Sequence, residues 1–374
     1  MNKRPEPTGE YAVGTFTYTI KDDREEVLKP GTKRSLSARV YYPVLPGAVE
    51  SMEKAEYMTR NMMQSLKSAF KIPLNYDKLT AQGENQTEAY QNAPKIQGAK
   101  FPLILFNHGY RSFREGNSFL CIDLASHGYV VITIAHPLEG VCTEYDDGTC
   151  VHEDKKHIKK VNSPLIPNLL AMKKLEKARG TDEELAKIFD AYQEKFGVLL
   201  KKRMDEWAKD IYAVLDYAKE NLEDMIDFEK GVGLTGHSFG GAMAYYLCMN
   251  DPQFTCGANI DGALFGDYKD RIMEKPFLQA TSTLNEHIVA RGRLYHRKPA
   301  YHAVFRDMKH VGFSDMKFAI PFPSMTGKLD AQSMHENLCK CHVEFFDAFL
   351  KGVKEVPQIT SNDVITFHVY EPDV

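Results

Sequence analysis

The 374-residue chain lacks several features that would place it in a broad functional class at once. Lysine and arginine total 47 against 51 aspartate and glutamate residues, so there is no basic excess of the kind that neutralises the phosphates of DNA or RNA. No run of about 18 apolar residues occurs, and the N-terminal stretch MNKRPEPTGEYAVG has no apolar segment after its basic residues. We therefore expect no nucleic-acid partner, no membrane span and no signal peptide, and a cytoplasmic location is the simplest expectation.

The number and spacing of the cysteines do not indicate a disulfide framework. Their count is odd, no C-x-x-C pair occurs, and several lie in apolar surroundings. The sequence CKCH at residues 339–342 matches no common zinc pattern and lies within a helical stretch. We expect reduced thiols, and we predict neither a metal site nor a cofactor. The seven cysteines are Cys121, Cys142, Cys150, Cys248, Cys256, Cys339 and Cys341.

Short apolar runs alternate with longer helical stretches along much of the chain. Most of these runs are unbroken, as expected for strands that are buried on both faces. The alternation predicts an α/β fold with a mostly parallel central sheet and helices on both faces. Near the N-terminus, EYAVGTFTYTI and LSARVYYPV are expected to form an antiparallel pair at the sheet edge. The other predicted strands are FPLILFN (101–107), YVVITIA (129–135), GVGLT (231–235), CGANID (256–261), PFLQAT (276–281) and YHAVF (301–305).

The strand signals stop between about 155 and 222, where the sequence predicts helices. Thr181 and Glu184 form a capping box at the start of one of them. The stretch KHIKKVNSPLIPNLLAMKKLEKARG mixes lysines with leucines, and we interpret it as an excursion above the sheet that forms a lid. Without a repeat or a long linker, residues 1–374 are expected to form a single domain with a helical insertion at about 152–205. The apolar stripes expected to face the core are Leu185, Ile188, Phe189, Tyr192 and Phe196, and then Met204, Trp207, Ile211 and Leu215.

The sequence GHSFGGA at residues 236–242 contains the motif G-x-S-x-G, and its context favours a nucleophilic serine. The run KGVGLT directly before it predicts a strand, and GAMAYYLCM directly after it predicts a helix. A sharp turn between strand and helix lifts the serine hydroxyl above the sheet edge, as nucleophilic attack requires. Gly236 and Gly240 leave space on either side of the strained residue. The pattern predicts Ser238 as a nucleophile rather than a helix N-cap in a glycine-rich turn.

A serine hydroxyl is a poor nucleophile at neutral pH, so it needs a general base later in the chain. His310 lies in RDMKHVGFSD, the loop that follows the predicted strand YHAVF, near the end of the sheet where the base of such a fold sits. His302 alternates into that strand and is expected to be structural. His287 and His296 lie in a polar loop and remain alternatives. We expect His310 to be the base.

Two carboxylates are candidates for the acid that orients this base. Asp261 ends the predicted strand CGANID, whereas Glu286 follows the next strand in STLNEH. Asp261 is the only charged residue of its strand and closes an otherwise apolar run. A buried carboxylate needs a partner such as an imidazole N–H. This argument favours Asp261, while the position of Glu286 is also compatible with a general hydrolase.

The anion that forms during acyl transfer needs backbone N–H donors. One is expected from Phe239, the residue after the nucleophile. The other is expected from the loop after the strand in LILFNHGYRSF, where His108 and Gly109 precede the N–H of Tyr110. His108 itself is expected to brace the loop rather than transfer protons.

These separated stretches resemble the platelet-activating factor acetylhydrolase family of serine esterases, of the plasma and intracellular type II kind with their bacterial relatives. FNHGYRSFR and CIDLASHGYVV resemble the family's oxyanion strand and the helix after it, and GHSFGGA resembles its nucleophile elbow. DPQFTCGANIDGALFGD and KHVGFSDM resemble the segments that carry its aspartate and its histidine, and PTGEYAVGTFTYTI resembles its N-terminal strand. The resemblance extends over residues from about 7 to 350.

The resemblance implies an α/β-hydrolase fold with Ser238 as nucleophile, Asp261 as acid and His310 as base. It implies Tyr110 and Phe239 as the backbone donors to the oxyanion. It also implies metal-independent hydrolysis of esters with short acyl groups, including the short sn-2 acyl group of phospholipids that resemble platelet-activating factor. The alternative is a general short-chain carboxylesterase or lactone hydrolase that acts on soluble metabolites, and a third interpretation is a catalytically silent binding protein.

Three residues depart from the family's pattern: Asn107 replaces a usual serine, Tyr110 is bulkier than usual, and Gly262 follows the aspartate where a larger side chain is common. Two apolar surfaces are candidates for contact with the substrate. One is the stripe of Met58, Met62, Leu66 and Phe70, and the other is PLIPNLLAM at residues 164–172, which lysines border. These surfaces fit either packing on the sheet or an entrance for lipid chains with weak contact to a membrane surface.

Overall fold

A computed structural model describes residues 4–72, 74–268, 271–320 and 322–372. Contacts within the chain divide these residues into two compact units. Unit 1 takes Arg4 and the described residues within Lys156–Ala208 and Lys230–Val374, and unit 2 takes those within Pro5–Lys155 and Lys209–Glu229. None of the described helices is long and apolar enough to cross a bilayer.

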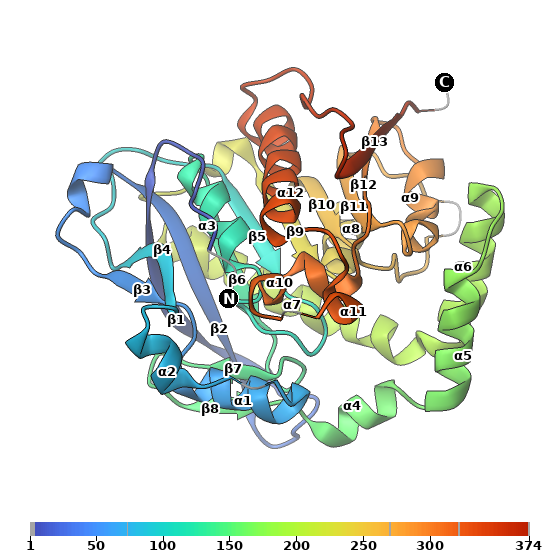
Figure 1. Ribbon diagram of the computed structural model, residues 1–374, viewed down its shortest axis with the longest axis horizontal. Coiled ribbons are helices and arrows are strands. Elements are labelled where there is room, and N and C mark those ends of the chain that lie inside the picture. The colour runs from blue at the N-terminus through green and yellow to red at the C-terminus, as the bar shows by residue number, and fades with distance from the viewer. Residues whose placement is uncertain (1–3, 73, 269–270, 321, 373–374) are drawn as a thin grey trace. The chain divides into compact units, whose positions relative to one another are not determined.

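The strands of unit 1 lie side by side in the order β13, β12, β11, β10 and β9 (Figure 1). Neighbours from β9 to β12 are parallel, and β13 pairs with β12 in the antiparallel direction. Every residue of β9, β11 and β12 is buried, which confirms that the unbroken apolar runs are strands covered on both faces. The strands are β9 (Val232–His237), β10 (Phe254–Ile260), β11 (Phe277–Ser282), β12 (Ala300–Phe305) and β13 (Ile365–Tyr370), and the helices beside them are α8 (Phe239–Asn250), α9 (Arg291–Leu294), α10 (Met316–Ala319), α11 (Pro323–Thr326) and α12 (Ala331–Phe346).

Helices α8 and α12 cover opposite faces of these strands. A Cβ added to Gly257 of β10 would lie 2.8 Å from the sulfur of Cys248 in α8. A Cβ added to Gly233 of β9 would lie 2.9 Å from the ring of Phe346 in α12. The two glycines are offset by one residue in the register of β9 and β10, and successive residues of a strand point to opposite faces. The prediction of helices on both faces is therefore confirmed in this unit.

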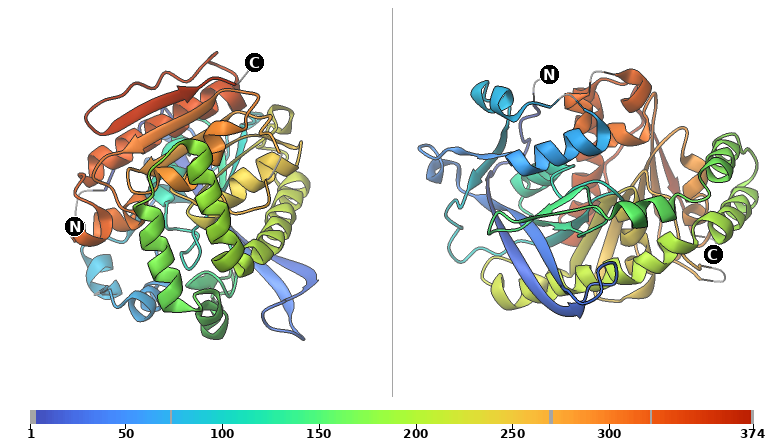
Figure 2. Two further views of the ribbon diagram at one scale, coloured as in Figure 1. Left: turned by 90° about the vertical axis from the view of Figure 1, so that its right-hand side faces the viewer. Right: turned by 90° about the horizontal axis from the view of Figure 1, so that it is seen from below.

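Four helices overlap the region predicted as a helical insertion, and the last of them continues well beyond it: α4 (Lys155–Val161), α5 (Leu165–Glu176), α6 (Asp182–Phe196) and α7 (Val198–Asn221). Helix α6 begins at the predicted capping box, in which the Thr181 hydroxyl accepts from the N–H of Glu184 and the Glu184 carboxylate accepts from the N–H of Thr181. Helices α5 and α6 lie side by side (Figure 2, left), where the Tyr192 hydroxyl donates to Asn168 at 2.9 Å.

The two apolar stripes of the insertion differ in their burial. Met204, Trp207, Ile211 and Leu215 are all buried, so the prediction that this stripe faces the core is confirmed. On α6 the prediction is wrong at Ile188, which is 38% exposed, while Ala186 and Gln193 are buried instead. Helix α6 buries a face rotated from the one that hydropathy alone indicates. Ion pairs from Arg291 and Arg293 hold α6 against α9, the first to Asp190 at 2.5 Å and the second to Asp182.

In unit 2 the strands lie in the order β5, β6, β2, β1, β4 and β3. The antiparallel pairing of β1 with β2 confirms that prediction, but its placement at the sheet edge is wrong, since β4 and β3 lie beyond β1. These two strands are short and polar, and therefore carry no apolar run that sequence analysis would recognise. The elements of unit 2 are β1 (Ala12–Glu25), β2 (Lys33–Val44), β3 (Lys54–Glu56), β4 (Gln86–Gln91), β5 (Leu103–Asn107), β6 (Val130–Ala135), β7 (Cys142–Glu144), β8 (Cys150–His152), α1 (Arg60–Phe70), α2 (Tyr76–Ala81) and α3 (Ser118–Ser126).

One pair of cysteines in unit 2 departs from the expectation of reduced thiols. Cys142 and Cys150 form a disulfide, and their Cα atoms lie 6.5 Å apart. They belong to β7 and β8, a two-stranded antiparallel hairpin in which Cys142 pairs with His152 and Cys150 with Glu144, so the two cysteines are diagonal neighbours on one face. The pairing depends on the register of two three-residue strands, which cysteine spacing does not reveal. The other five cysteines are buried, in keeping with their apolar surroundings.

Candidate active site

Ser238 occupies the sharp turn between β9 and α8 in unit 1. Its backbone has φ 58° and ψ −122°, in a region that residues with a Cβ rarely adopt. The Ser238 N–H donates to the carbonyl of Ile260 at 2.8 Å, which ties the turn to the end of the neighbouring strand β10. The predicted strand-turn-helix context is therefore present, and the strain is held by the buried elements on both sides.

The structure brings together the three side chains predicted to act as a catalytic triad. His310, in the first position of a short 3₁₀ turn after β12, has its Nε2 2.8 Å from Ser238 Oγ. Its Nδ1 lies 2.8 Å from Oδ2 of Asp261, the residue directly after β10. A neutral imidazole that donates from Nδ1 to the carboxylate presents a lone pair at Nε2 to the serine hydroxyl. This arrangement is able to remove the hydroxyl proton as the oxygen attacks.

The side chains of the predicted triad differ in their exposure to solvent. The Asp261 side chain is fully buried, whereas that of His310 is 42% exposed. Because a buried carboxylate needs partners, two further donors satisfy Asp261. The N–H of Ser282 donates to Oδ1 at 2.8 Å, and Asn285 Nδ2 donates to Oδ2 at 2.7 Å. Sequence analysis did not identify Asn285, although it adjoins the alternative acid in STLNEH.

The alternative candidates lie in other surroundings. Glu286 begins a separate 3₁₀ turn, and burial raises the pKa of its carboxyl. His302 is buried in β12, where its Nε2 lies 2.7 Å from Thr281 Oγ1, and burial lowers its pKa well below the ordinary value. Burial also lowers the pKa of His287, to about 4. Both ring nitrogens of His296 lie about 3 Å from backbone carbonyls, at 2.9 and 3.0 Å. The ring nitrogens of His302 and His296 therefore have partners other than Ser238.

His237, directly before the nucleophile, is a second histidine at the site that sequence analysis missed. Burial, with His310 beside it, lowers the pKa of His237 to about 3, so the ring is neutral at pH 7. Its Nε2 lies 3.0 Å from the backbone carbonyl of His310, to which a neutral ring donates. The centroids of the two imidazole rings are 4.7 Å apart. His237 therefore holds the segment that carries the predicted base.

The turn after Asp261 packs directly beneath Ser238. A Cβ added to Gly262 would lie 2.1 Å from the carbonyl oxygen of Ser238 and 2.5 Å from Asn259 Oδ1. Asn259 fixes this turn, because its Oδ1 accepts from the N–H of Gly262 at 2.9 Å and its Nδ2 donates to the Gly262 carbonyl at 2.7 Å. Gly241 is equally confined, with Asn259 Oδ1 1.9 Å from the position of its absent Cβ. The glycine that departs from the family's pattern is thus required by this packing.

We expect Gly262→Ala to lower both stability and turnover. The added methyl group overlaps the Ser238 carbonyl, so the backbone must shift at a free-energy cost of about 1–3 kcal/mol. Because a shift of about 1 Å in a reacting group costs about a hundredfold in rate, kcat should fall at least about tenfold. Urea unfolding and initial rates on p-nitrophenyl acetate measure the two effects. Gly47→Ala is the control, since nothing lies within 4 Å of its Cβ position, and equal values for both variants would contradict the packing argument.

Phe239, the predicted first oxyanion donor, is the first residue of α8. The first four N–H groups of a helix have no carbonyl partner within it, and they favour negative charge. The Phe239 ring is 4% exposed and lies edge-on against Trp207, with centroids 4.8 Å apart. Phe265 adds a third ring, 6.4 Å from that of Phe239. An apolar aromatic cluster therefore holds the beginning of α8 next to the nucleophile.

The predicted second donor, Tyr110, belongs to a turn in unit 2 directly after β5. The N–H of Ser112 donates to the carbonyl of Gly109 at 2.8 Å. Burial lowers the pKa of His108 to about 3, and the neutral ring has Nδ1 2.7 Å from the Gly109 carbonyl, to which it donates. Its Nε2 accepts from the N–H of His136 at 3.2 Å. These contacts join His108 to the backbone on both sides of its ring, as expected for a residue that braces the loop. Tyr110 remains the predicted donor.

A buried charged cluster supports the start of this loop. Asp210 lies between Arg34, at 2.5 Å, and His136, whose Nδ1 is 2.9 Å away. Burial alone would raise the pKa of Asp210, but the Arg34 guanidinium outweighs it and holds the pKa below its ordinary value. On its other side, His136 Nε2 lies 3.2 Å from the side chain of Asn107, the last residue of β5. Asn107 thus takes part in a buried polar network.

Three comparisons relate this chain to known proteins. A family model described as platelet-activating factor acetylhydrolase, isoform II, matches residues 1–351. Platelet-activating factor acetylhydrolase from Cavia porcellus is 25% identical over 378 residues, which cover 96% of this chain and 80% of that relative. The enzyme of the same name from Canis lupus familiaris is 32% identical over 185 residues, which cover 48% of this chain and 39% of that relative.

Among solved structures, a ferulic acid esterase from Streptomyces cinnamoneus superposes with a TM-score of 0.72 at 21% sequence identity, over 97% of this chain and 98% of that one. This likeness confirms the predicted α/β-hydrolase fold. The family is shown by the family model, which matches residues 1–351. The chain belongs to the platelet-activating factor acetylhydrolase family of carboxylic ester hydrolases.

Proposed function

We propose that this chain hydrolyses esters with short acyl groups through a Ser238–His310–Asp261 triad and an acyl-enzyme intermediate. The observation that carries the proposal is the pair of 2.8 Å contacts of His310, one to Ser238 Oγ and one to Asp261 Oδ2. A serine, a base and an acid in this order of contact are the parts that acyl transfer to serine requires. The strained backbone of Ser238 adds support. Glycine would adopt this conformation at a lower cost, so a serine at this position indicates that its side chain is needed.

The first step forms the acyl-enzyme. Ser238 Oγ attacks the ester carbonyl while His310 Nε2 takes the hydroxyl proton, and Asp261 stabilises the imidazolium that forms. The same proton then passes to the leaving alcohol as the ester bond breaks. In the second step water attacks the acyl-enzyme, His310 takes a proton from that water, and the proton returns to Ser238 as the acid leaves.

The oxyanion of each tetrahedral intermediate needs donors that are already in place. We propose the N–H of Phe239, at the first position of α8, as one of them. The N–H of Tyr110, in the turn that His108 braces, is the second proposed donor. The positive end of α8 favours the same negative charge.

The family name supports a short acyl group, since its members are named as acetylhydrolases. The test is a series of initial rates on p-nitrophenyl acetate, butyrate and octanoate, and on a phosphocholine lipid with an sn-2 acetyl group. We expect kcat/KM to fall at least about tenfold from acetate to octanoate, because a pocket built for a short chain clashes with a longer one. Hydrolysis of the acetyl phospholipid would assign the chain to lipid substrates. Activity on the soluble esters alone would favour the general carboxylesterase, and octanoate as the best substrate would contradict the proposal.

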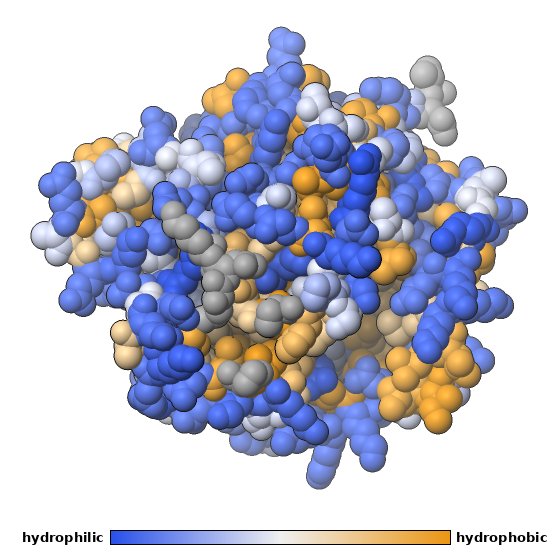
Figure 3. All heavy atoms as spheres, in the orientation of Figure 1, coloured by the Kyte–Doolittle hydropathy of each residue, from blue (hydrophilic) through white to orange (hydrophobic). Residues whose placement is uncertain are grey.

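The second apolar surface considered from the sequence is exposed, and we propose that it contacts lipid surfaces as part of a lid. Apolar side chains of α5 gather at the lower right of Figure 3, over the helix labelled in Figure 1. Lysines flank them, among them Lys173 and Lys174 of the same helix. An apolar face with a basic border suits a membrane interface. The first apolar surface, which ends on α1, is packed instead, because Met58, Met62 and Leu66 are buried and Phe70 alone among its four residues is exposed. The exposed side chains of α5 are Leu165, Ile166, Leu169, Leu170 and Met172.

Replacing two of these side chains should weaken binding to vesicles. The double variant Ile166→Glu with Leu170→Glu removes two apolar groups, each worth about 1.5–3 kcal/mol when fully buried, and adds charges that an acidic surface repels. We expect the fraction that sediments with phosphatidylcholine–phosphatidylglycerol vesicles to fall at least about tenfold. Val353→Glu is the control, since that side chain is 63% exposed elsewhere in unit 1. Equal sedimentation of the double variant and the wild type would exclude α5 as the contact.

A further inference from the structure

The hairpin of β7 and β8 in unit 2 presents three metal-ligating side chains on one face. Cys142 and His152 are directly opposite each other in the antiparallel register. Cys150 lies two residues before His152 on the same strand, and therefore points to the same face. One ligand atom from each of the three side chains lies within 4.8 Å of the other two. The sequence C-x₇-C-x-H thus becomes a cluster through the pairing of two short strands.

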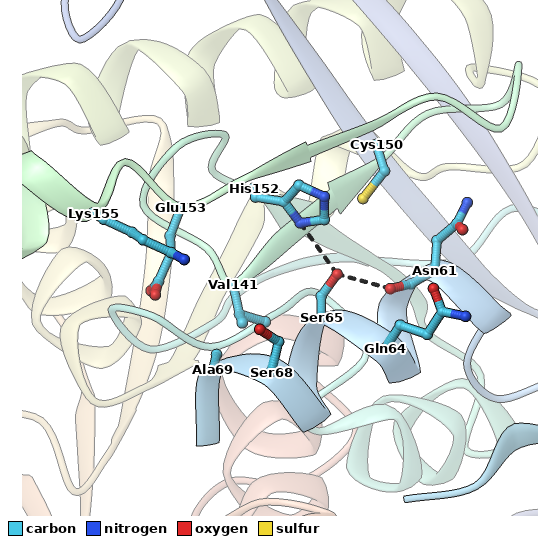
Figure 4. Close-up of a pocket in the computed structure, with 10 residues that line it drawn as sticks. All are labelled: Asn61, Gln64, Ser65, Ser68, Ala69, Val141, Cys150, His152, Glu153 and Lys155. Carbon is cyan, nitrogen blue, oxygen red and sulfur yellow. Dashed lines mark hydrogen bonds between the residues drawn. The ribbon is translucent and has the colours of Figure 1, made fainter. Parts of the chain in front are cut away.

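A hydrogen bond fixes which nitrogen of His152 is available. Ser65 Oγ lies 2.7 Å from the carbonyl of Asn61, one turn earlier in α1, and 3.2 Å from Nδ1 of His152. A hydroxyl has one hydrogen, and the carbonyl can only accept, so the hydroxyl donates to Asn61 and accepts from His152. Nδ1 therefore carries the proton of the neutral ring, and Nε2 keeps a lone pair. Figure 4 shows this second nitrogen on the side of the ring that faces the Cys150 sulfur.

The surroundings leave room for an ion and for access to it. A cavity of about 650 Å³ is lined by Cys150, His152 and Ser65, among others (Figure 4). The neighbouring Glu153 is engaged elsewhere, since its carboxylate accepts from Arg111 Nε at 2.7 Å. Tetrahedral zinc with bonds of about 2.3 Å to sulfur and about 2.0–2.1 Å to nitrogen needs ligand atoms about 3.3–3.8 Å apart. Reduction frees both cysteine side chains to rotate about their Cα–Cβ bonds toward this spacing.

We propose that the reduced form of this hairpin binds one zinc ion through Cys142 Sγ, Cys150 Sγ and His152 Nε2, and that the disulfide form excludes it. A dithiol reductant supplies two electrons and two protons to the disulfide and is itself oxidised to a disulfide. Zinc then displaces the two thiol protons and forms two Zn–S bonds and one Zn–N bond, which gives a site of zero net charge. Water from the cavity takes the fourth position. Transfer of two electrons from the thiolates to a disulfide oxidant, which takes up two protons from water and becomes a dithiol, re-forms the Cys142–Cys150 disulfide and releases the ion. Ser65 acts as the outer partner that orients the imidazole.

Zinc binding to the reduced full chain tests this site without reference to esterase activity. The protein is reduced with dithiothreitol, desalted under argon and titrated with zinc in competition with a chromophoric chelator. The wild type should bind one zinc per chain in the reduced form, and the oxidised form should bind none at this site. Cys150→Ser should abolish the site. Ser65→Ala should weaken binding about 10- to 100-fold, the range found when the outer partner of a ligand is lost. His152→Ala removes a ligand itself and should weaken binding by at least about 100-fold.

The controls separate this hairpin from other thiols and from misfolding. Cys341→Ser removes a buried thiol of the CKCH sequence in α12 and should leave zinc binding unchanged. His152 is exposed, so its replacement leaves the core intact and its result is informative even if a cysteine variant fails to fold. Equal affinity of the reduced wild type and His152→Ala would overturn the proposal. So would zinc binding by the reduced wild type no tighter than by its oxidised form.

Discussion

Replacing Ser238 by alanine should lower kcat on p-nitrophenyl acetate at least about a thousandfold while the protein stays folded. The nucleophile is lost, and only oxyanion stabilisation and substrate binding remain to accelerate the attack of water. Alanine has the same Cβ as serine, so the strained backbone at φ 58° is no worse for the variant. The initial rates of wild type and variant at pH 8, with near-UV circular dichroism of both, measure the effect.

The matched control is Ser51→Ala, which removes a hydroxyl from an exposed position in unit 2. Its rate should equal that of the wild type within experimental scatter. If Ser238→Ala retained full activity, the motif GHSFGGA would be a structural turn only. The interpretation as a binding protein, or a different catalytic site, would then replace the triad.

Asp261→Asn should lower kcat about 10⁴-fold, with a small effect on KM. The backbone N–H of Ser282 donates to Oδ1 and can only donate, so an amide there is held with its oxygen at that position. Asn285 and His310 both contact Oδ2, and the Asn285 amide is able to turn and accept. Its NH₂ group is then left facing His310 Nδ1. The imidazole must accept at Nδ1 and carry its proton at Nε2, where it has no lone pair to take the proton of Ser238. The loss therefore arises from the wrong tautomer and should appear in kcat.

Glu286→Gln discriminates between the two carboxylates considered as the acid. Glu286 lies in a separate turn after β11, so its replacement should change kcat by less than about twofold. Steady-state rates of both variants under the same conditions provide the comparison. A large loss in Glu286→Gln together with near-normal activity of Asp261→Asn would reverse the assignment.

The parts of the fold that could be predicted are those whose signal is local. The runs at residues 231–235, 276–281 and 301–305 correspond to β9, β11 and β12, because a buried parallel strand is apolar on both faces. The capping box before α6 was predicted for the same reason, since it depends on two residues three apart. Strand, turn and helix around Ser238 likewise follow one another directly in the sequence.

The features that could not be predicted depend on pairing between distant segments. Strand β13 has one buried residue, Ile365, and its apolar residues do not form an unbroken run, although the strand completes one edge of its sheet. The disulfide and the position of His152 follow from the register of β7 and β8, which no periodicity reveals. Gly262 lies close to Ser238 and Asn259 because of tight packing in the folded protein. Their positions along the sequence do not indicate these contacts.

The role of Ser238 as the nucleophile is tested most directly by covalent trapping. A fluorophosphonate reacts with an activated serine and releases fluoride, and mass spectrometry of the digested protein locates the adduct. The triad predicts one adduct per chain on the peptide that contains Ser238, none in Ser238→Ala, and slow labelling of Asp261→Asn. An adduct on another residue, or undiminished esterase activity in protein fully labelled at Ser238, would contradict the proposed site.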